Sequence, residues 1–366
     1  MWKGTLQDQY LSTGQEGYAF AAPVCYPDGV ELIDCALGTN PLGTPPSVKA
    51  VLETAKELSV CGYPEPEPER LKETIVSKFP SWNVRPEHIL VGGGSMGVLV
   101  TLSRLLLGPE ASFTGVSPQF TDGVLQGMYT GASYHPVLPE APGFVFGGDI
   151  PQRLTASASS LIYLDRPNNP TGQTLSLEMV ERISREAMNK NTWLLVDEAY
   201  GDFIPDEESA ASIDLPNLVT CRSFSKGRGA AGIRVGFALT RNRELAAAFR
   251  KLQPPFVVGV LDALLAEAIL QDDRFLEETR RYVRSAKEKT IRALQGKKGL
   301  TAAETDLRAP ILLLTRESGD LVAMLGASGI SCEPGTGFFG LDNSSVRLRV
   351  PSPEHLDEFL RRLDAL

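Results

Sequence analysis

The fold is decided by residues 160–200, which read SLIYLDRPNNPTGQTLSLEMVERISREAMNKNTWLLVDEAY. Residues 160–164 and 192–196 are continuous apolar runs between polar loops, as is typical of strands buried on both faces. The segment between them predicts a helix over 176–189, with Ser176 as its N-cap and Glu178 in its first turn. A strand, a helix and a second strand in this order predict a parallel sheet covered by helices.

This alternation extends outward from about residue 61 to about 245, and the pattern then changes. Long helices are expected at 243–251 and 261–294, the second interrupted near 271–273, and apolar strands follow at 309–314 and 346–350. We therefore predict an α/β protein: a three-layer α/β/α large domain with a mostly parallel sheet, plus a smaller α+β domain. The expected division is an N-terminal arm with part of the small domain (1–60), a large domain (61–245) and a C-terminal small domain (246–366).

Composition excludes several classes of protein. The 366 residues carry a net charge of −9, and Lys and Arg are dispersed, which disfavours nucleic acid or a membrane surface as a partner. No apolar stretch approaches a membrane span and no signal peptide is recognised. Five cysteines without a CxxC pair favour a reducing, cytoplasmic location. Three histidines, none beside a cysteine or an acidic cluster, give no reason to expect a metal.

Polar residues follow several of the apolar runs at the point where each predicted strand ends. The carboxyl ends of strands in an open α/β sheet are where ligands bind. Each residue alone has a simpler explanation, such as a turn, a helix cap or a solvated lysine, but their joint occurrence favours one site. The set is Gly94, Ser95 and Met96 in a glycine turn, then Asn169, Asp197, Tyr200, Ser223, Ser225, Lys226 and Arg234.

Pyridoxal phosphate (PLP) requires groups of these kinds. Backbone N–H groups at a helix N-terminus suit its phosphate, and a buried carboxylate keeps its pyridine nitrogen protonated. Its aldehyde forms a Schiff base with a nucleophilic lysine. The assignments are Gly94, Ser95, Met96, Ser223, Ser225 and Arg234 for the phosphate, Asp197 for the nitrogen, Asn169 and Tyr200 for the phenolate oxygen, Lys226 for the aldehyde and Phe120 for stacking on the ring.

With these motifs, the chain resembles the fold-type I, class I/II PLP-dependent aminotransferase superfamily, in the branch of histidinol-phosphate aminotransferase and threonine-phosphate decarboxylase. The likeness runs from residues 38–43 to the segment around Arg347, and its most specific motifs are 168–172, 197–200, 223–226 and 232–236. It implies a homodimer with shared active sites, in which Tyr63 reaches the neighbouring subunit's phosphate. It also implies that Arg347 binds the substrate carboxylate, with Arg349 as a rival on the same strand face, and that Asn40 contacts the substrate.

Some residues depart from the superfamily's usual pattern. Gly38 and Thr39 stand where histidinol-phosphate aminotransferases carry Asn and Glu, and Met96 and Gly97 replace an acidic pair. Arg228 stands where an aromatic residue is usual, and two interpretations remain open: a solvated cation, or a contact with an anionic or polar part of an unusual substrate. These departures weaken the histidine-pathway assignment and leave the cofactor assignment intact.

The predicted activity is transamination of an amino acid or an amino-acid-derived amine, in specialised biosynthesis. Lys226 would be displaced by the donor amine and would then shuttle the Cα proton. The alternatives are a PLP-dependent decarboxylase, lyase or cyclase, which cofactor motifs do not distinguish from an aminotransferase. A non-catalytic binding protein on this fold is a remote third alternative, because such a protein would be expected to lack Lys226 or Asp197.

Overall fold

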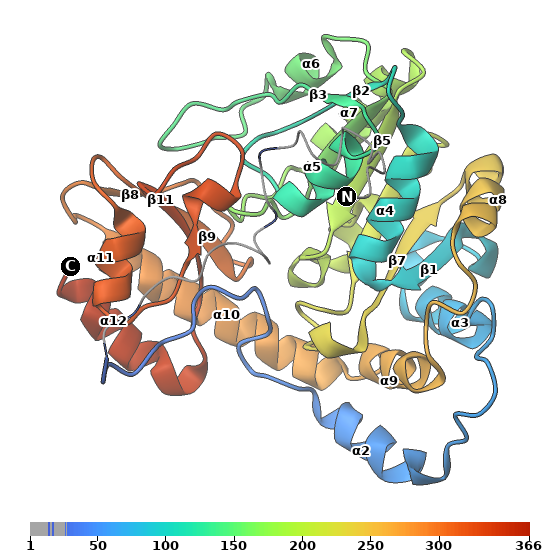
Figure 1. The fold of residues 1–366 in the computed structure, drawn as a ribbon, viewed down its shortest axis with the longest axis horizontal. Helices are drawn as coiled ribbons and strands as arrows, with labels where there is room; N and C mark the ends of the chain where they lie inside the picture. The colour runs from blue at the N-terminus through green and yellow to red at the C-terminus, as the bar shows by residue number, and fades with distance from the viewer. Residues whose placement is uncertain (1–13, 15–16, 18–25, 27) are drawn as a thin grey trace, which may run out of the picture.

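The computed structural model describes residues 28–366 together with Gly14, Gly17 and Tyr26. In this part of the chain the larger sheet has seven strands in the order β1–β7–β6–β5–β4–β2–β3 (Figure 1). All run parallel except β7, which is antiparallel to both of its neighbours. The strands are β1 (Ile89–Gly93), β2 (Ser112–Gly115), β3 (Ser133–Tyr134), β4 (Leu161–Asp165), β5 (Trp193–Glu198), β6 (Leu218–Ser223) and β7 (Val235–Thr240).

Both faces of this sheet are covered, as the continuous apolar runs predict. Along β4, Leu161 and Tyr163 pack on one face, and Ile162 and Leu164 pack on the other. The first face is covered by α4 (Gly94–Leu106), α5 (Thr121–Met128) and α8 (Arg243–Leu252). The second face is covered by α3 (Glu69–Lys78), α6 (Ile150–Thr155), α7 (Leu177–Met188) and α9 (Val260–Leu270). The three-layer prediction is confirmed.

A second sheet of four antiparallel strands has the order β10–β11–β9–β8 among the described residues. Its strands are β8 (Leu300–Ala302), β9 (Ile311–Arg316), β10 (Glu333–Pro334) and β11 (Ser345–Arg349). Helices α10 (Asp273–Leu294), α11 (Leu321–Ala327) and α12 (Leu356–Asp364) contribute to the same core. Figure 1 shows α10 crossing the lower half of the view, from the region of the smaller sheet to α9.

Two packing details bear on the expected domain boundaries. Ile33 forms a parallel bridge with Ile330, so the chain near residue 33 belongs to the core of the smaller sheet. Helices α8 and α9, which the expected boundary at 245 assigns mostly to the C-terminal domain, pack instead against the larger sheet. Among the described residues, no helix combines the length and the apolar character needed to cross a membrane.

Candidate active site

A cavity of about 230 Å³ lies at the carboxyl ends of β4, β5 and β6, where the sequence predicts a site. It brings together ten of the predicted residues: Ser95, Met96, Phe120, Asn169, Asp197, Tyr200, Ser223, Ser225, Lys226 and Arg234. Gly94 is not in this lining, but it lies next to the guanidinium of Arg234, which is. The lining also includes Leu37, Gly38, Thr39, Asp165, Pro167, Ala199 and Ala231.

One end of the cavity is built to hold an anion. Helix α4 starts directly after β1 at Gly94, and no side chain caps its N-terminus. A Cβ atom at Gly94, which has a φ of +72°, would lie 2.6 Å from Nη2 of Arg234, so the glycine lets the guanidinium reach the start of the helix. Arg234 is held there because its Nη1 donates to the carbonyl of Ala231 (2.9 Å). Free N–H groups, the helix dipole and a guanidinium suit a phosphate.

Asp197 marks a second position in the cavity. Its Oδ1 accepts from the backbone N–H of Ala199 (2.9 Å) and its Oδ2 from the hydroxyl of Tyr163 (3.1 Å). Burial nevertheless raises the pKa of Asp197 to about 6, although the nearby Lys226 amine acts to lower it. The carboxylate is therefore short of positive charge, and a protonated pyridine nitrogen would supply it. Tyr163, which supports Asp197 through this hydrogen bond, could not be singled out from the sequence because it lies inside an apolar run.

Lys226 and Tyr200 form the third part of the site. The Nζ of Lys226 lies 5.4 Å from the centroid of the Tyr200 ring. The buried hydroxyl of Tyr200 has no hydrogen-bond partner among the described residues, which is costly unless a ligand provides one. A Cβ atom at Gly38 would overlap this hydroxyl and lie 2.9 Å from the Lys226 Nζ. In this arrangement the Lys226 amine and the Tyr200 hydroxyl occupy the space that a side chain at Gly38 would need.

Asp165 organises the wall between these groups, a role that sequence analysis did not assign. Its Oδ2 accepts from the backbone N–H groups of Phe120 (3.0 Å) and Asn169 (2.7 Å). Burial raises the pKa of Asp165 to about 7, against the lowering effect of those hydrogen bonds. Its position at the end of an apolar run could have identified it, because Asp165 pairs in register with Asp197 at the end of the neighbouring strand. Asp165 thus fixes two of the predicted cofactor contacts.

The two candidate carboxylate-binding arginines have different surroundings. Arg347 donates from Nη1 to Oδ1 of Asn169 (3.0 Å), which places its guanidinium directly behind the cavity wall. Arg349 is engaged with the N-terminal segment: its guanidinium donates to the carbonyl groups of Leu37 and Asp34 and to the Asp34 carboxylate (2.9 Å). Arg347 also donates from Nη2 to the carbonyl of Ala36 (2.6 Å), so both guanidinium groups contact the N-terminal segment, and they differ in that Arg347 also reaches Asn169 beside the cavity.

Asn40 and Arg228 do not line the cavity. Asn40 donates from Nδ2 to the carbonyl of Gly227 (2.8 Å), so it holds the turn that follows the lysine. Arg228 is only 3% exposed and donates from Nη1 to the carbonyls of Ile269 (3.4 Å) and Leu270 (3.2 Å) at the end of α9. This burial contradicts the interpretation of Arg228 as a solvated cation. Its contacts anchor the lysine turn to α9, and a contact with the substrate stays a prediction.

Arg228 also ends a row of buried charges beneath the lysine turn. Its Nε lies 3.5 Å from Oδ1 of Asp202, which accepts from Arg222 at 3.0 Å. Arg222 in turn contacts Glu198 (3.3 Å), and Glu198 contacts Arg166 (2.9 Å). Removing one member of such a row leaves an uncompensated buried charge. The row therefore ties the loops after β4, β5 and β6 together.

Tyr63 lies apart from this cavity. Its side chain is 86% exposed and its ring stacks on Phe256 at a centroid distance of 4.9 Å. Nothing in the geometry of one chain brings it to the cofactor set. Among the described residues, no group of three or more His, Cys, Asp or Glu side chains is placed to hold a metal ion.

The cavity residues fit PLP on structural grounds: an unpartnered buried phenol, a buried carboxylate short of positive charge, and a helix N-terminus with an arginine. The α/β/α sheet with this arrangement at its strand ends is that of the PLP-dependent enzymes of fold type I.

Comparisons with known proteins agree. The family model described as aminotransferase class I and II matches residues 30–363, and the chain belongs to this family. A histidinol-phosphate aminotransferase from Symbiobacterium thermophilum is 31% identical over 92% of this chain and 90% of its own length. Among solved structures, the histidinol-phosphate aminotransferase from Sinorhizobium meliloti in complex with PLP superposes with a TM-score of 0.79 at 22% identity, covering 92% and 91% of the two chains. An aspartate aminotransferase from Thermus thermophilus with maleate gives 0.84 at 22% identity, covering 99% and 100%.

The protein is thus a PLP-dependent aminotransferase that acts on an amino acid or an amino-acid-derived amine.

Proposed function

We propose that Lys226 is the cofactor-attachment and proton-transfer residue of this aminotransferase. The observation that carries the proposal is the meeting of the Lys226 amine, the Asp197 carboxylate and the Tyr200 hydroxyl at one cavity. PLP bound there supplies an electron-withdrawing ring that stabilises negative charge at the substrate Cα. Lys226 would hold the cofactor through its Nζ, and the same amine would then act as the base and acid that moves the proton of the substrate Cα.

The other cavity residues would bind and orient the cofactor. Asp197 would hold the proton on the pyridine nitrogen, and Tyr200 and Asn169 would donate to the phenolate oxygen. Phe120 would pack against the ring face. The phosphate would be bound by Gly94, Ser95, Met96, Ser223, Ser225 and Arg234.

At the substrate end, we propose that Arg347 binds the carboxylate of the donor. Its guanidinium lies next to Asn169, which lines the cavity, and a planar guanidinium binds a carboxylate bidentately. Arg349 is occupied by the backbone and carboxylate of the N-terminal segment. The buried contacts of Asn40 and Arg228 support positioning roles rather than substrate binding.

Single-turnover assays test the activity and its alternatives together. The PLP-loaded enzyme is mixed with a panel of amino donors, without any keto-acid acceptor, and the keto product is quantified. Transamination predicts one equivalent of keto acid per site and no release of carbon dioxide. A donor without a Cα proton, 2-methylalanine, is the control. Carbon dioxide in place of keto acid would support a decarboxylase, and no keto product from any donor would overturn the proposal.

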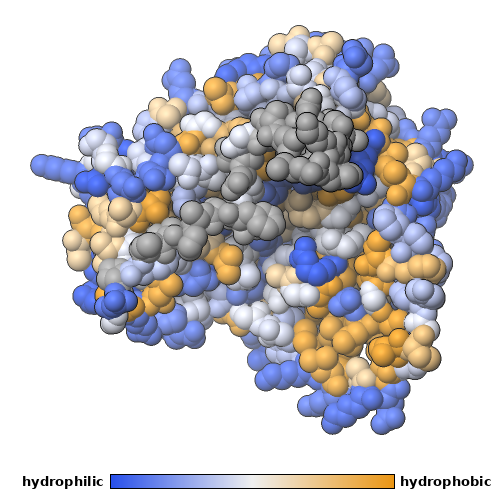
Figure 2. Space-filling view, viewed as in Figure 1, coloured by the Kyte–Doolittle hydropathy of each residue, from blue (hydrophilic) through white to orange (hydrophobic). Residues whose placement is uncertain are grey.

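We further propose that the enzyme is a homodimer with shared active sites. Helix α2 (Pro46–Thr54) contains no buried residue, and apolar side chains in it and in the segment that follows are exposed: Leu52 (47%), Val60 (80%) and Tyr63 (86%). Figure 2 shows hydrophobic residues gathered at the lower right of this face, over α2 and α9. Exposed apolar area of this kind typically marks an interface.

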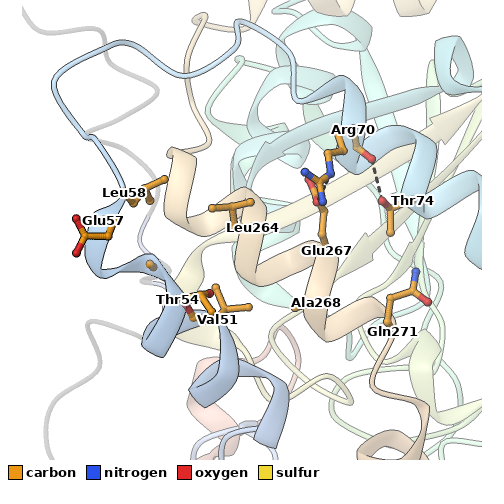
Figure 3. Close-up of a pocket in the computed structure, with 11 residues that line it drawn as sticks. Val51, Thr54, Glu57, Leu58, Arg70, Thr74, Leu264, Glu267, Ala268 and Gln271 are labelled. Carbon is orange, nitrogen blue, oxygen red and sulfur yellow. Dashed lines mark hydrogen bonds and ion pairs between the residues drawn. The ribbon is translucent and has the colours of Figure 1, made fainter.

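A groove of about 600 Å³ separates α2 from α9 in the same region (Figure 3). Val51 and Leu58 line one side, and Leu264 lines the other. An ion pair between Arg70 and Glu267 (2.9 Å) lies at one edge, and Arg70 remains largely exposed. A second copy covering this groove would bury the apolar sides and bring Tyr63 toward the phosphate site of its partner.

The dimer is tested with Val60→Glu, which places a charge in the proposed interface. We expect the wild-type protein to have the mass of two chains by light scattering, and Val60→Glu to be largely monomeric with most of its activity lost. Val145→Glu, at another exposed apolar position (58%), should remain dimeric and active. A monomeric wild type, or a dimeric Val60→Glu protein, would contradict the proposal.

We also propose a cytoplasmic location and a division of the chain into three parts. The cysteine pattern supports a cytoplasmic enzyme. The predicted parts are residues 1–60, 61–245 and 246–366. Because α8 and α9 pack on the larger sheet, we place the second boundary nearer residue 270.

A further inference from the structure

Glu333 is the cross-strand neighbour of Arg347 in the smaller sheet. Strands β10 and β11 pair antiparallel with Glu333 opposite Arg347, so the two side chains point to the same face of the small sheet. The Glu333 Oε2 lies 3.6 Å from Nη2 of Arg347. Both side chains are buried, with 6% and 2% exposure. A carboxylate therefore stands beside the arginine that we assign to the substrate anion.

Among the residues that the structure describes, the charges around Glu333 are more acidic than basic. Burial raises the pKa of Glu333 to about 7; Arg347 acts to lower it and Asp122 acts to raise it further. Asp122 lies in the first turn of α5, and burial raises its pKa as well. Within the described part of the chain, Tyr26 and Cys332 also interact with Glu333. Arg347 is thus one cation facing two acidic side chains.

We propose that Glu333 limits the anion site of Arg347 to a singly charged carboxylate and excludes phosphate monoesters. The proposal rests on the assignment of Arg347 as the substrate anchor in the proposed function. A carboxylate brings one negative charge, which Arg347 can balance, especially when Glu333 takes up a proton. A phosphate monoester brings a charge of about −1.5 to −2 at pH 7. With Glu333 and Asp122 nearby, its additional charge meets repulsion in a partly desolvated site.

This inference narrows the substrate class. The donor would be an α-amino acid that retains its carboxylate, and phosphorylated amino alcohols would be poor donors. The named relatives are histidinol-phosphate aminotransferases, so Glu333 would separate this enzyme from its relatives by repulsion of the wrong anion rather than by a new attraction.

The test measures ligand binding without turnover. Acetate and methyl phosphate are each titrated by calorimetry into the PLP-loaded enzyme at pH 8, so that the cofactor fills its own phosphate site. We expect the wild type to bind acetate at least tenfold more tightly than methyl phosphate. Glu333→Gln keeps the size of the side chain. In this variant the affinity for methyl phosphate should rise at least tenfold, and the affinity for acetate should rise by a smaller factor. Glu317→Gln, at an exposed carboxylate directly after β9, is the matched control and should leave both affinities unchanged.

A pH series adds a measurement that a purely structural role of Glu333 would not affect. Binding of a carboxylate favours the protonated form of Glu333, so acetate affinity should fall as the pH rises through about 7 in the wild type. In Glu333→Gln this fall should be lost. Asp122→Asn should shift methyl phosphate affinity in the same direction as Glu333→Gln by a smaller factor, and it decides the question if Glu333→Gln does not fold.

Several outcomes would overturn the inference. These are methyl phosphate binding the wild type as tightly as acetate, equal improvement of both ligands in Glu333→Gln, and no binding of either ligand. Failure of the proposed function gives a different result: no donor yields keto acid, while the discrimination between acetate and methyl phosphate persists.

Discussion

Replacing Lys226 with alanine is expected to lower transamination by roughly 10⁴-fold or more, because it removes both the attachment of the cofactor and the base that moves the Cα proton. The absorbance band of the lysine-bound cofactor should disappear from the purified protein. Phosphate and ring contacts remain, so PLP should still bind, but it should be removed readily by dialysis. Absorbance spectra and single-turnover keto-acid yield measure these effects.

Two controls separate the chemistry of Lys226 from a general loss of charge. Lys251→Ala, at an exposed lysine in the last turn of α8, should have a wild-type spectrum and wild-type activity. Methylamine added to Lys226→Ala should restore part of the proton transfer, because a free amine can occupy the space left by the side chain. If the band or the activity persisted in Lys226→Ala without added amine, the assignment of the lysine would be wrong.

The local pattern of the sequence predicts much of this site, because strand ends are local features. Ser176 was expected to cap a helix, and its hydroxyl accepts from the N–H of Met179. Asp197 and Lys226 were expected at one edge of a parallel sheet, and both line the same cavity. The break expected near 271–273 separates α9 from α10. Apolar periodicity and the residues that end each run suffice for these conclusions.

Contacts between distant residues could not be predicted in this way. Asn40 was assigned to the substrate, yet its amide binds Gly227, 187 positions away. Arg228 is buried against the end of α9 because α9 packs beneath the lysine turn, which no local pattern reveals. Strand periodicity places Arg347 and Arg349 on one face, and only their partners distinguish them. Glu333 gained significance only from the register that sets it opposite Arg347.

Asp197 combines a catalytic benefit with a cost in stability, and Asp197→Asn should reveal both. Asparagine keeps the size of the side chain but cannot hold a proton on the pyridine nitrogen by its charge. We expect single-turnover rates to fall by roughly 10²–10³-fold, the range seen when one preorganised electrostatic contact is removed. The PLP-loaded protein should also lose the cofactor more readily.

Asp197→Asn weakens the PLP-loaded enzyme, but it should stabilise the protein without cofactor. Burial raises the pKa of Asp197 from 3.8 to about 6, so the folded state binds this proton more tightly than the unfolded chain does. The free energy of unfolding should therefore decrease as the pH rises from about 4 to about 6, by about 3 kcal/mol from this group at 1.36 kcal/mol for each pKa unit. Asparagine lacks this titration, so cofactor-free Asp197→Asn should be more stable than the wild type above pH 6.

Denaturant unfolding of both cofactor-free proteins at pH 4.5 and pH 8 measures this difference, with Asp28→Asn at an exposed turn as the control. A variant that is less stable than the wild type at pH 8 would show that the carboxylate is satisfied without a cationic ligand. A variant that is more stable but nearly inactive would show that the buried charge of Asp197 is maintained for the cofactor, at a cost to the fold that only the bound cation offsets.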